Sequence, residues 1–353
     1  MPLELDIVIC THNNAPLLDR TLQALAKQKT GDDTIWRVLV VDNCCTDDTA
    51  QVVERHMGAG EIADLRRVEE PRLGLTPARV CGVRSTLADW IAYVDDDCLL
   101  HPDWVEEAAG FLREHPNIGG LGGQVILDWE TPPPAYFHNF EWAYAAQNHG
   151  ESAREVGCLA GAGLIVSRRA LNESGWLQKQ WMSDRVGKKL VSGGDVEMAL
   201  RIRGAGFPLW YHPGCQLQHV ICARRICDAY LCRMNEGLGV SQTFADAMTW
   251  PRGFASWRLS ALNQAARGVL ELLPPAVKAL AGRRSKRAVL ASWSFARGRG
   301  AGVFALMRFK ERRQLLGCAN KPSQPRTPRG SGLEGGVSAC KASGAGLMPP
   351  SNL

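Results

Sequence analysis

The chain of 353 residues is 45% hydrophobic and 22% charged, with a formal net charge of +5. It is long enough to bury a sizeable core, and it has no run of about 18 apolar residues that could span a bilayer, so we expect a soluble globular protein. Residues 1–6 are acidic and lack the apolar segment of a secretory signal, which predicts a cytoplasmic location.

The charge is unevenly distributed along the chain. Residues 1–251 carry 23 basic and 33 acidic side chains, whereas residues 252–313 carry 14 basic and only 2 acidic ones. A segment as basic as the second favours contact with a polyanionic surface. The acidic first part is the better candidate for metal-dependent chemistry.

Two strand and helix units open the chain. Residues 5–10 form an apolar run typical of a buried strand, and Pro16 is well placed to begin a helix after it. Residues 37–41 predict a second buried strand that ends in Asp42, and a second helix follows near Val52. This alternation predicts an α/β fold.

A later apolar run ends in three consecutive carboxylates. Residues 90–94 predict a buried strand, and Asp95, Asp96 and Asp97 follow it directly. Adjacent carboxylates repel one another, and a divalent cation is the usual means of neutralising them. The carboxyl ends of strands in open α/β sheets are also where ligands bind. The sequence therefore predicts a metal and nucleotide site here, with a solvated acidic turn as the alternative.

Arg79 lies in the first turns of a helix expected to begin at residue 74. A cation is unfavourable near the positive end of a helix dipole. Either Arg79 is an ordinary surface residue, or acidic neighbours such as Asp95 or Asp97 hold it there. The sequence leaves both readings open.

A second group of acids follows further along the chain. Asp195 and Glu197 are two residues apart and cannot share a helix face, so one can point into a cleft while the other points into the protein. Acids near a helix start are also favoured simply by the helix dipole. Further strands are expected over residues 124–127, 158–166, 207–211 and 216–220, the last of which contains His219.

The C-terminal part has a different character. A helix is expected over residues 222–245, and residues 252–313 mix aromatic with basic side chains, as interfacial amphipathic helices do. An ordinary helical appendage with a solvated basic face is the alternative. We expect three units: a catalytic domain over residues 1–240, a basic helical appendage over residues 241–317, and a disordered tail over residues 318–353.

Together these motifs resemble the family-two inverting glycosyltransferases of the GT-A (Rossmann-like) fold, which use nucleotide-sugar donors. This resemblance implies an α/β fold with a mixed, mostly parallel sheet flanked by helices. The resemblance covers about residues 5–240 and rests on motifs in a fixed order: residues 7–13, residues 40–43 with Asp47 and Thr49, Gly74 with Ala78 and Arg79, the three aspartates 95–97, residues 192–197, and His219. Val80 departs from the usual Asn. Gly194 replaces the usual first acid of the segment that contains Asp195.

The resemblance implies roles for individual residues. Mn²⁺ or Mg²⁺ would be held by Asp95, Asp97 and His219, and Asp195 would be the general base, with Glu197 as the next candidate. The residues implied to bind the nucleotide-sugar are Thr11, Asn13, Asp42, Arg79, Asp95 and Asp96. Because three carboxylates are more than one site needs, we also expect removal of Asp97 to relieve repulsion and leave the fold intact.

The resemblance further implies a biological setting. We expect transfer from a UDP-type or GDP-type sugar to a glycan or lipid-linked acceptor in cell-envelope polysaccharide synthesis. The anionic inner face of the plasma membrane would be a peripheral partner, and nucleic acid would not be one. A nucleotidyltransferase is one alternative, although residues 11–14 are not the glycine-rich basic loop it would need. A catalytically inactive membrane-binding module is another.

Overall fold

Eight strands of the main sheet run in the order β3-β2-β1-β4-β9-β6-β10-β8. The computed structural model describes residues 2–182, 184–185, 190–251, 253–261 and 285–320. The strands of this sheet are β1 (Leu3–Thr11), β2 (Thr34–Asp42), β3 (Leu65–Glu69), β4 (Trp90–Asp95), β6 (Gly120–Gly122), β8 (Arg154–Val156), β9 (Leu164–Ser167) and β10 (Leu209–Tyr211). Strands β1 to β4 are parallel, β9 is antiparallel to β4 and β6, and β10 is parallel to β6 but antiparallel to β8. The mixed, mostly parallel sheet predicted from the sequence is confirmed.

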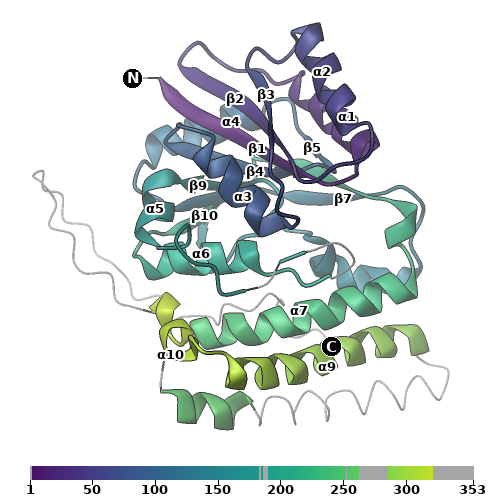
Figure 1. Cartoon of the computed structure of the whole chain (residues 1–353), viewed down its shortest axis with the longest axis vertical. Coiled ribbons are helices and arrows are strands. Elements are labelled where there is room, and N and C mark those ends of the chain that lie inside the picture. Colours follow the sequence, from purple (N-terminus) through teal and green to yellow (C-terminus); the bar gives the residue numbers. More distant parts are fainter. Residues whose placement is uncertain (1, 183, 186–189, 252, 262–284, 321–353) are drawn as a thin grey trace, which may run out of the picture.

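Helices cover both faces of this sheet (Figure 1). Successive strand side chains point to opposite faces, so Ile7 and Ile9 pack in one hydrophobic cluster and Val8 in another. The first cluster includes α1 (Ala15–Leu25), α2 (Thr49–Ala59) and α4 (Trp104–Glu114). The second includes α3 (Leu75–Arg84), α5 (Arg168–Glu173) and α6 (Gly194–Gly204). The result is a three-layer arrangement whose loops after β1, β2 and β4 share one edge.

A small second sheet brings distant residues to that edge. It consists of β5 (Cys98–Leu100), β11 (Leu217–Ile221) and β7 (Val125–Trp129). The antiparallel register places His219 opposite Cys98, and Val220 donates its backbone N–H to the Asp97 carbonyl at 2.8 Å. The histidine predicted at the end of the sheet is thereby fixed beside the three aspartates.

Two helices pack side by side beneath the sheet domain, α7 (Asp228–Met248) and α9 (Lys286–Arg308) (Figure 1). They approach closely at Gly298, which has no side chain. A Cβ atom at this position would overlap the backbone carbonyl oxygen of Glu236. The boundary expected at residue 240 falls inside α7, which is one continuous helix. Further short elements are η1 (Ala135–Tyr144), η2 (Ala223–Arg225), α10 (Arg312–Leu315) and η3 (Cys318–Asn320), and residues 254–261 are also helical.

Several of the expected strands and helices begin or end at other residues in the structure. The strand expected over residues 158–166 begins only at Leu164, because the preceding residues form a loop in which Gly163 takes a φ of +72°. The helix expected over residues 222–245 begins at Asp228. Residues 318–320 of the expected tail form η3 and pack on α6, whereas residues 321–353, like residues 252 and 262–284 of the basic segment, lie outside the described residues.

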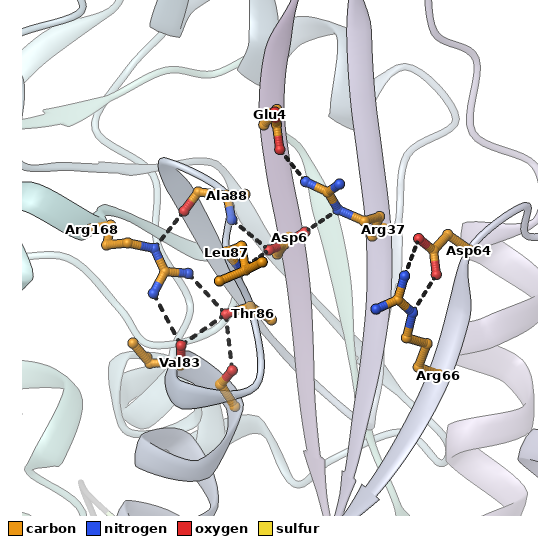
Figure 2. A network of polar contacts seen from close by, with 11 residues as sticks. Glu4, Asp6, Arg37, Asp64, Arg66, Val83, Thr86, Leu87, Ala88 and Arg168 are labelled. Atoms are coloured by element: carbon orange, nitrogen blue, oxygen red, sulfur yellow. Dashed lines mark hydrogen bonds and ion pairs between the residues drawn. The ribbon is translucent and has the colours of Figure 1, made fainter.

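At the amino ends of the parallel strands, opposite the end just described, the buried carboxylate of Asp6 holds several elements together (Figure 2). Asp6 on β1 accepts a 2.7 Å hydrogen bond from Arg37 Nε on β2, and also the backbone N–H groups of Leu87 and Ala88 at 3.0 and 2.8 Å. Arg168 donates to the carbonyl of Ala88 on the other side of the same loop. These bonds tie the connection between α3 and β4 to the amino end of the sheet.

Within the described residues, no helix is long and apolar enough to cross a membrane.

Candidate active site

A cavity of about 940 Å³ opens at the carboxyl ends of β1, β2 and β4. A volume of this size suits a ligand as large as a nucleotide-sugar. Of the residues predicted to form the site, the cavity is lined by Thr11, Arg79, Asp95, Asp96, Asp97, Asp195 and His219. Asn13, Asp42 and Glu197 are not part of its lining.

The turn after β1 is held by the second aspartate. Thr11 Oγ1 donates to Asp96 Oδ2 at 2.6 Å, and Asn14 Nδ2 donates to Asp96 Oδ1 at 2.7 Å. Burial and the neighbouring Asp97 raise the pKa of Asp96 to about 7. Asn13 takes a φ of 53°, a left-handed conformation that asparagine tolerates well, and its Oδ1 accepts the Thr46 N–H at 2.7 Å. Asp96 therefore lines the cavity and holds the turn after β1, whereas Asn13 braces that turn from outside the lining.

The end of β2 is braced in a similar way. Asp42 accepts the Cys45 N–H at 3.0 Å and pairs with Arg67 at 2.9 Å. Asn43, which lines the cavity, is buried and accepts the Gly74 N–H at 2.7 Å while its amide nitrogen donates to the carbonyl of Glu70. Asn43 belongs to the motif of residues 40–43 on which the resemblance rests, but it was not among the residues expected to bind the nucleotide-sugar.

The proposed metal ligands are brought together. His219 Nε2 lies 3.3 Å from Asp97 Oδ1, and His219 Nδ1 lies 2.8 Å from the carbonyl oxygen of Tyr144. A carbonyl only accepts, so Nδ1 carries a proton, and Nε2 is the ring nitrogen that faces Asp97 and is placed to bind a metal ion when it is unprotonated. Burial and the charge of Asp97 raise the pKa of Asp95.

These residues fit a hard divalent cation. Ligand atoms of Asp95, Asp97 and Cys98 lie within 4.8 Å of one another. Burial raises the pKa of the Cys98 thiol well above its ordinary value, and Mg²⁺ and Mn²⁺ prefer oxygen ligands to sulfur. Two carboxylates that share a buried site with one imidazole are the more suitable set.

Arg225 is a further cation at this site that the sequence did not reveal. Its Nη1 donates to Asp97 Oδ2 at 2.8 Å, and both side chains are buried. Burial acts to raise the pKa of Asp97, but His219 and Arg225 lower it well below its usual range. The expectation that losing Asp97 would simply relieve repulsion is therefore wrong, because the loss would strand a buried guanidinium.

The structure separates the two acids at the start of α6. Glu197 is fully buried, and its carboxylate accepts the backbone N–H groups of Trp181 and Met182 at 2.7 to 3.0 Å and pairs with Arg201 at 3.0 Å. Asp195 lines the cavity and packs against Gly161, where any side chain would overlap its carboxylate. The absence of a side chain at Gly161 therefore makes room for the Asp195 carboxylate.

Arg79 is not a surface residue. It is buried, and its Nη1 donates to Asp184 Oδ2 at 2.8 Å. The sequence had offered Asp95 or Asp97 as its partner, whereas the hydrogen-bonded partner is Asp184 from the loop before α6. A lone aspartate in an irregular loop gives no local pattern by which it could have been found.

Comparison with known proteins agrees with this geometry. The model of the family described as glycosyl transferase family 2 matches residues 6–175. This part of the chain belongs to glycosyl transferase family 2. The family 2 domain so defined holds β1 to β9 and the three aspartates, while Asp195 and His219 lie beyond the matched range.

Curated relatives match the family 2 domain at low identity. The glucosyl-dolichyl phosphate glucuronosyltransferase of Haloferax volcanii is 24% identical over 205 residues, which cover 57% of this chain and 63% of that protein. The poly(ribitol-phosphate) beta-N-acetylglucosaminyltransferase TarS of Staphylococcus aureus is 26% identical over 151 residues, which cover 40% of this chain and 26% of TarS. The chain thus spans less than two thirds of the length of either relative.

A solved structure shares the fold over most of the chain. The mannosyltransferase PcManGT of Pyrobaculum calidifontis, determined in complex with GDP-Man and Mn²⁺, aligns with a TM-score of 0.53 at 20% identity. The alignment covers 92% of this chain and 87% of that one. The predicted GT-A fold of the family 2 domain is therefore confirmed.

Proposed function

We propose that the chain is a metal-dependent glycosyltransferase that moves a sugar from a nucleotide-diphosphate donor to a hydroxyl group of a glycan or lipid-linked acceptor, with inversion at the anomeric carbon. One observation carries this proposal. A single cavity holds the cation-binding set Asp95, Asp97 and His219, and also a separate carboxylate, Asp195, from another element. Such a cavity can place a metal-bound diphosphate and an acceptor on opposite sides of one sugar.

The donor would occupy the edge formed by β1, β2 and β4. A Mn²⁺ or Mg²⁺ ion held by Asp95, Asp97 and His219 would neutralise the diphosphate as it leaves. The braced turns that contain Thr11 and Asn43 form the neighbouring wall of the cavity, where the nucleoside would lie.

Asp195 is the residue we assign as general base. The acceptor oxygen would attack the anomeric carbon, the bond from that carbon to the diphosphate oxygen would break, and the acceptor proton would pass to Asp195. Attack from the face opposite the leaving group inverts the centre. Among the described residues no ion pair involves the Asp195 carboxylate, whereas Glu197 is fully engaged by backbone donors and Arg201. The Asp195 carboxylate accepts the backbone N–H of Val196 at 2.9 Å but is outside these ion pairs. A carboxylate without a cationic partner is the better proton acceptor, and removing a general base usually costs about 10²- to 10⁴-fold in rate.

A lipid-linked acceptor is supported by the surface of α9. Its exposed face carries apolar side chains at helical spacing, Leu290, Trp293, Phe304 and Met307. Lys286, Arg287, Arg297 and Arg308 are exposed on the same helix. Apolar and basic groups side by side favour the headgroup region of an anionic membrane. The name of the Haloferax volcanii relative also describes a lipid-phosphate acceptor.

The test is a screen of UDP-sugars and GDP-sugars with the purified chain and Mn²⁺. We expect one donor to be hydrolysed slowly, or transferred when an acceptor is added, with activity lost in EDTA and restored by Mn²⁺. Asp195→Asn is the matched control for contaminating activity. Turnover that is independent of metal, or equal in wild type and Asp195→Asn, would contradict the proposed function.

A further inference from the structure

The loop between α5 and α6 carries a buried aspartate with a specific partner. Arg79 Nη1 and Asp184 Oδ2 are 2.8 Å apart, and their side chains are only 5% and 1% exposed. Each buried ion would cost several kcal/mol if left alone, so the two depend on each other. They come from positions 105 residues apart in the sequence.

The same carboxylate occupies the space in front of Gly194. A Cβ atom at position 194 would lie 2.5 Å from Asp184 Oδ2 and 3.4 Å from Arg79 Nη1. No side chain can be added there unless Asp184 moves. The motif that this chain resembles has an acid at this position, and here the space for it is filled by a carboxylate from the preceding loop.

The charge of Arg79 also interacts with the acidic side chains that line the cavity. Burial tends to lower its pKa, but the charges of Asp184, Asp195 and Asp95 raise it above its ordinary value. Arg79 and Asp195 also line the same cavity, and Arg79 Nη1 would lie 3.4 Å from a Cβ at Gly194, the neighbour of Asp195. Arg79 is thus within electrostatic reach of the carboxylate we assign as base. An arginine that paired directly with Asp195 would stabilise its charged form and make it a poor proton acceptor. Asp184 binds the arginine and prevents that pairing.

We propose that Asp184 is a positioning residue for the transfer reaction, which holds Arg79 away from Asp195, and that Gly194 is glycine because it makes room for this carboxylate. The inference rests on the proposed function, since it assigns a role relative to the base. It concerns this chain's own residues and needs no assumption about which sugar or nucleotide binds.

Moving the carboxylate from one position to the other tests this inference. The separation of 2.5 Å is about that between Cβ and a carboxylate oxygen within an aspartate, so an aspartate at 194 can place an oxygen where Asp184 Oδ2 now lies. Three variants are needed: Asp184→Gly, Gly194→Asp, and the double variant. Asp184→Gly strands Arg79, and Gly194→Asp forces two carboxylates into one space.

We expect both single variants to lose at least roughly tenfold in kcat, with the donor KM changed less than about threefold, because misplaced groups near the reacting atoms are costly. The double variant should recover to within about fivefold of wild type. A carboxylate with only a structural role at position 184 would change Tm without this selective loss of kcat. A double variant no more active than Asp184→Gly would overturn the inference.

Thermal unfolding of the same four proteins keeps the inference separate from the proposed function. We expect each single substitution to lower Tm and the double variant to lie above both, whether or not a donor has been found. Absence of transfer in the wild type would count against the proposed function alone. A double variant less stable than either single one would overturn the inference about Asp184 and Gly194.

Discussion

Arg225 donates a 2.8 Å hydrogen bond to Asp97, the last of the three aspartates after β4. The Nε and Nη2 atoms of Arg225 are buried and have no hydrogen-bond partner within the described part of the chain. The pair therefore joins two functions: Asp97 is a proposed metal ligand, and it is also the counter-ion that lets Arg225 be buried.

This relationship predicts two separable effects of Asp97→Ala. Metal-dependent binding of UDP or GDP should be lost, and the free energy of unfolding should fall by about 3–5 kcal/mol, because a buried guanidinium is left unpaired. Calorimetric titration with Mn²⁺ and each nucleotide measures the first effect, and urea unfolding measures the second. Adding Arg225→Met should restore much of the stability but not the binding. Undiminished Mn²⁺-dependent binding in Asp97→Ala would refute the metal assignment.

The two acids of α6 should respond differently to the loss of charge. Asp195→Asn should unfold like wild type and bind donor, yet lose on the order of 10²-fold or more in kcat. Glu197→Gln should instead lower stability by about 1–3 kcal/mol, because its amide nitrogen would face the buried N–H groups of Trp181 and Met182. Steady-state kinetics and urea unfolding on the same preparations compare the two. Transfer by Asp195→Asn within a few-fold of wild type would move the base elsewhere.

Asp6, the buried aspartate in Figure 2, should contribute to stability and not to catalysis. Asp6→Ala removes the acceptor of Arg37 and of the Leu87 and Ala88 N–H groups, and we expect a loss of about 2–3 kcal/mol. Asp64→Ala is the control, because its pair with Arg66 is largely exposed and should contribute at most about 1 kcal/mol. Urea unfolding measures both. Equal effects of the two substitutions would show that the Asp6 network is not needed.

The exposed face of α9 should decide membrane association. Replacing Trp293 and Phe304 together by Ser removes two apolar side chains, each of which contributes about 1.5–3 kcal/mol when fully buried, so sedimentation with anionic vesicles should fall by at least roughly tenfold. Leu87→Ser is the matched control, because Leu87 is 90% exposed but lies on the loop between α3 and β4. Association should also weaken at high salt.

Wild-type protein that stays in the supernatant at low salt would contradict this prediction. Point substitutions are preferable to truncation before Pro251. The opposite face of α9 packs on α7 through Phe295 and Leu306, so removing the helix would expose the core between them.

The sequence by itself determined the fold class and the position of the carboxylates. The apolar runs that became β1, β2 and β4 each end in polar or acidic residues, and parallel strands bring their carboxyl ends to one edge. This inference uses only local hydrophobicity and chain order. The spacing of Asp195 and Glu197 likewise showed that one must point away from the other, because helix geometry alone fixes that.

Only the tertiary structure decided which charges meet. Asp184 lies 105 residues from Arg79, and Arg225 lies 128 residues from Asp97. Asp184 lies in a loop and Arg225 in a single short turn of helix, and neither stretch carries a periodic pattern. Which acid of α6 faces the cavity was also undecided, since that depends on the backbone donors of Trp181 and Met182 that happen to meet Glu197. Contacts of this kind follow from sheet order and loop path, and neither leaves a signal in the residues themselves.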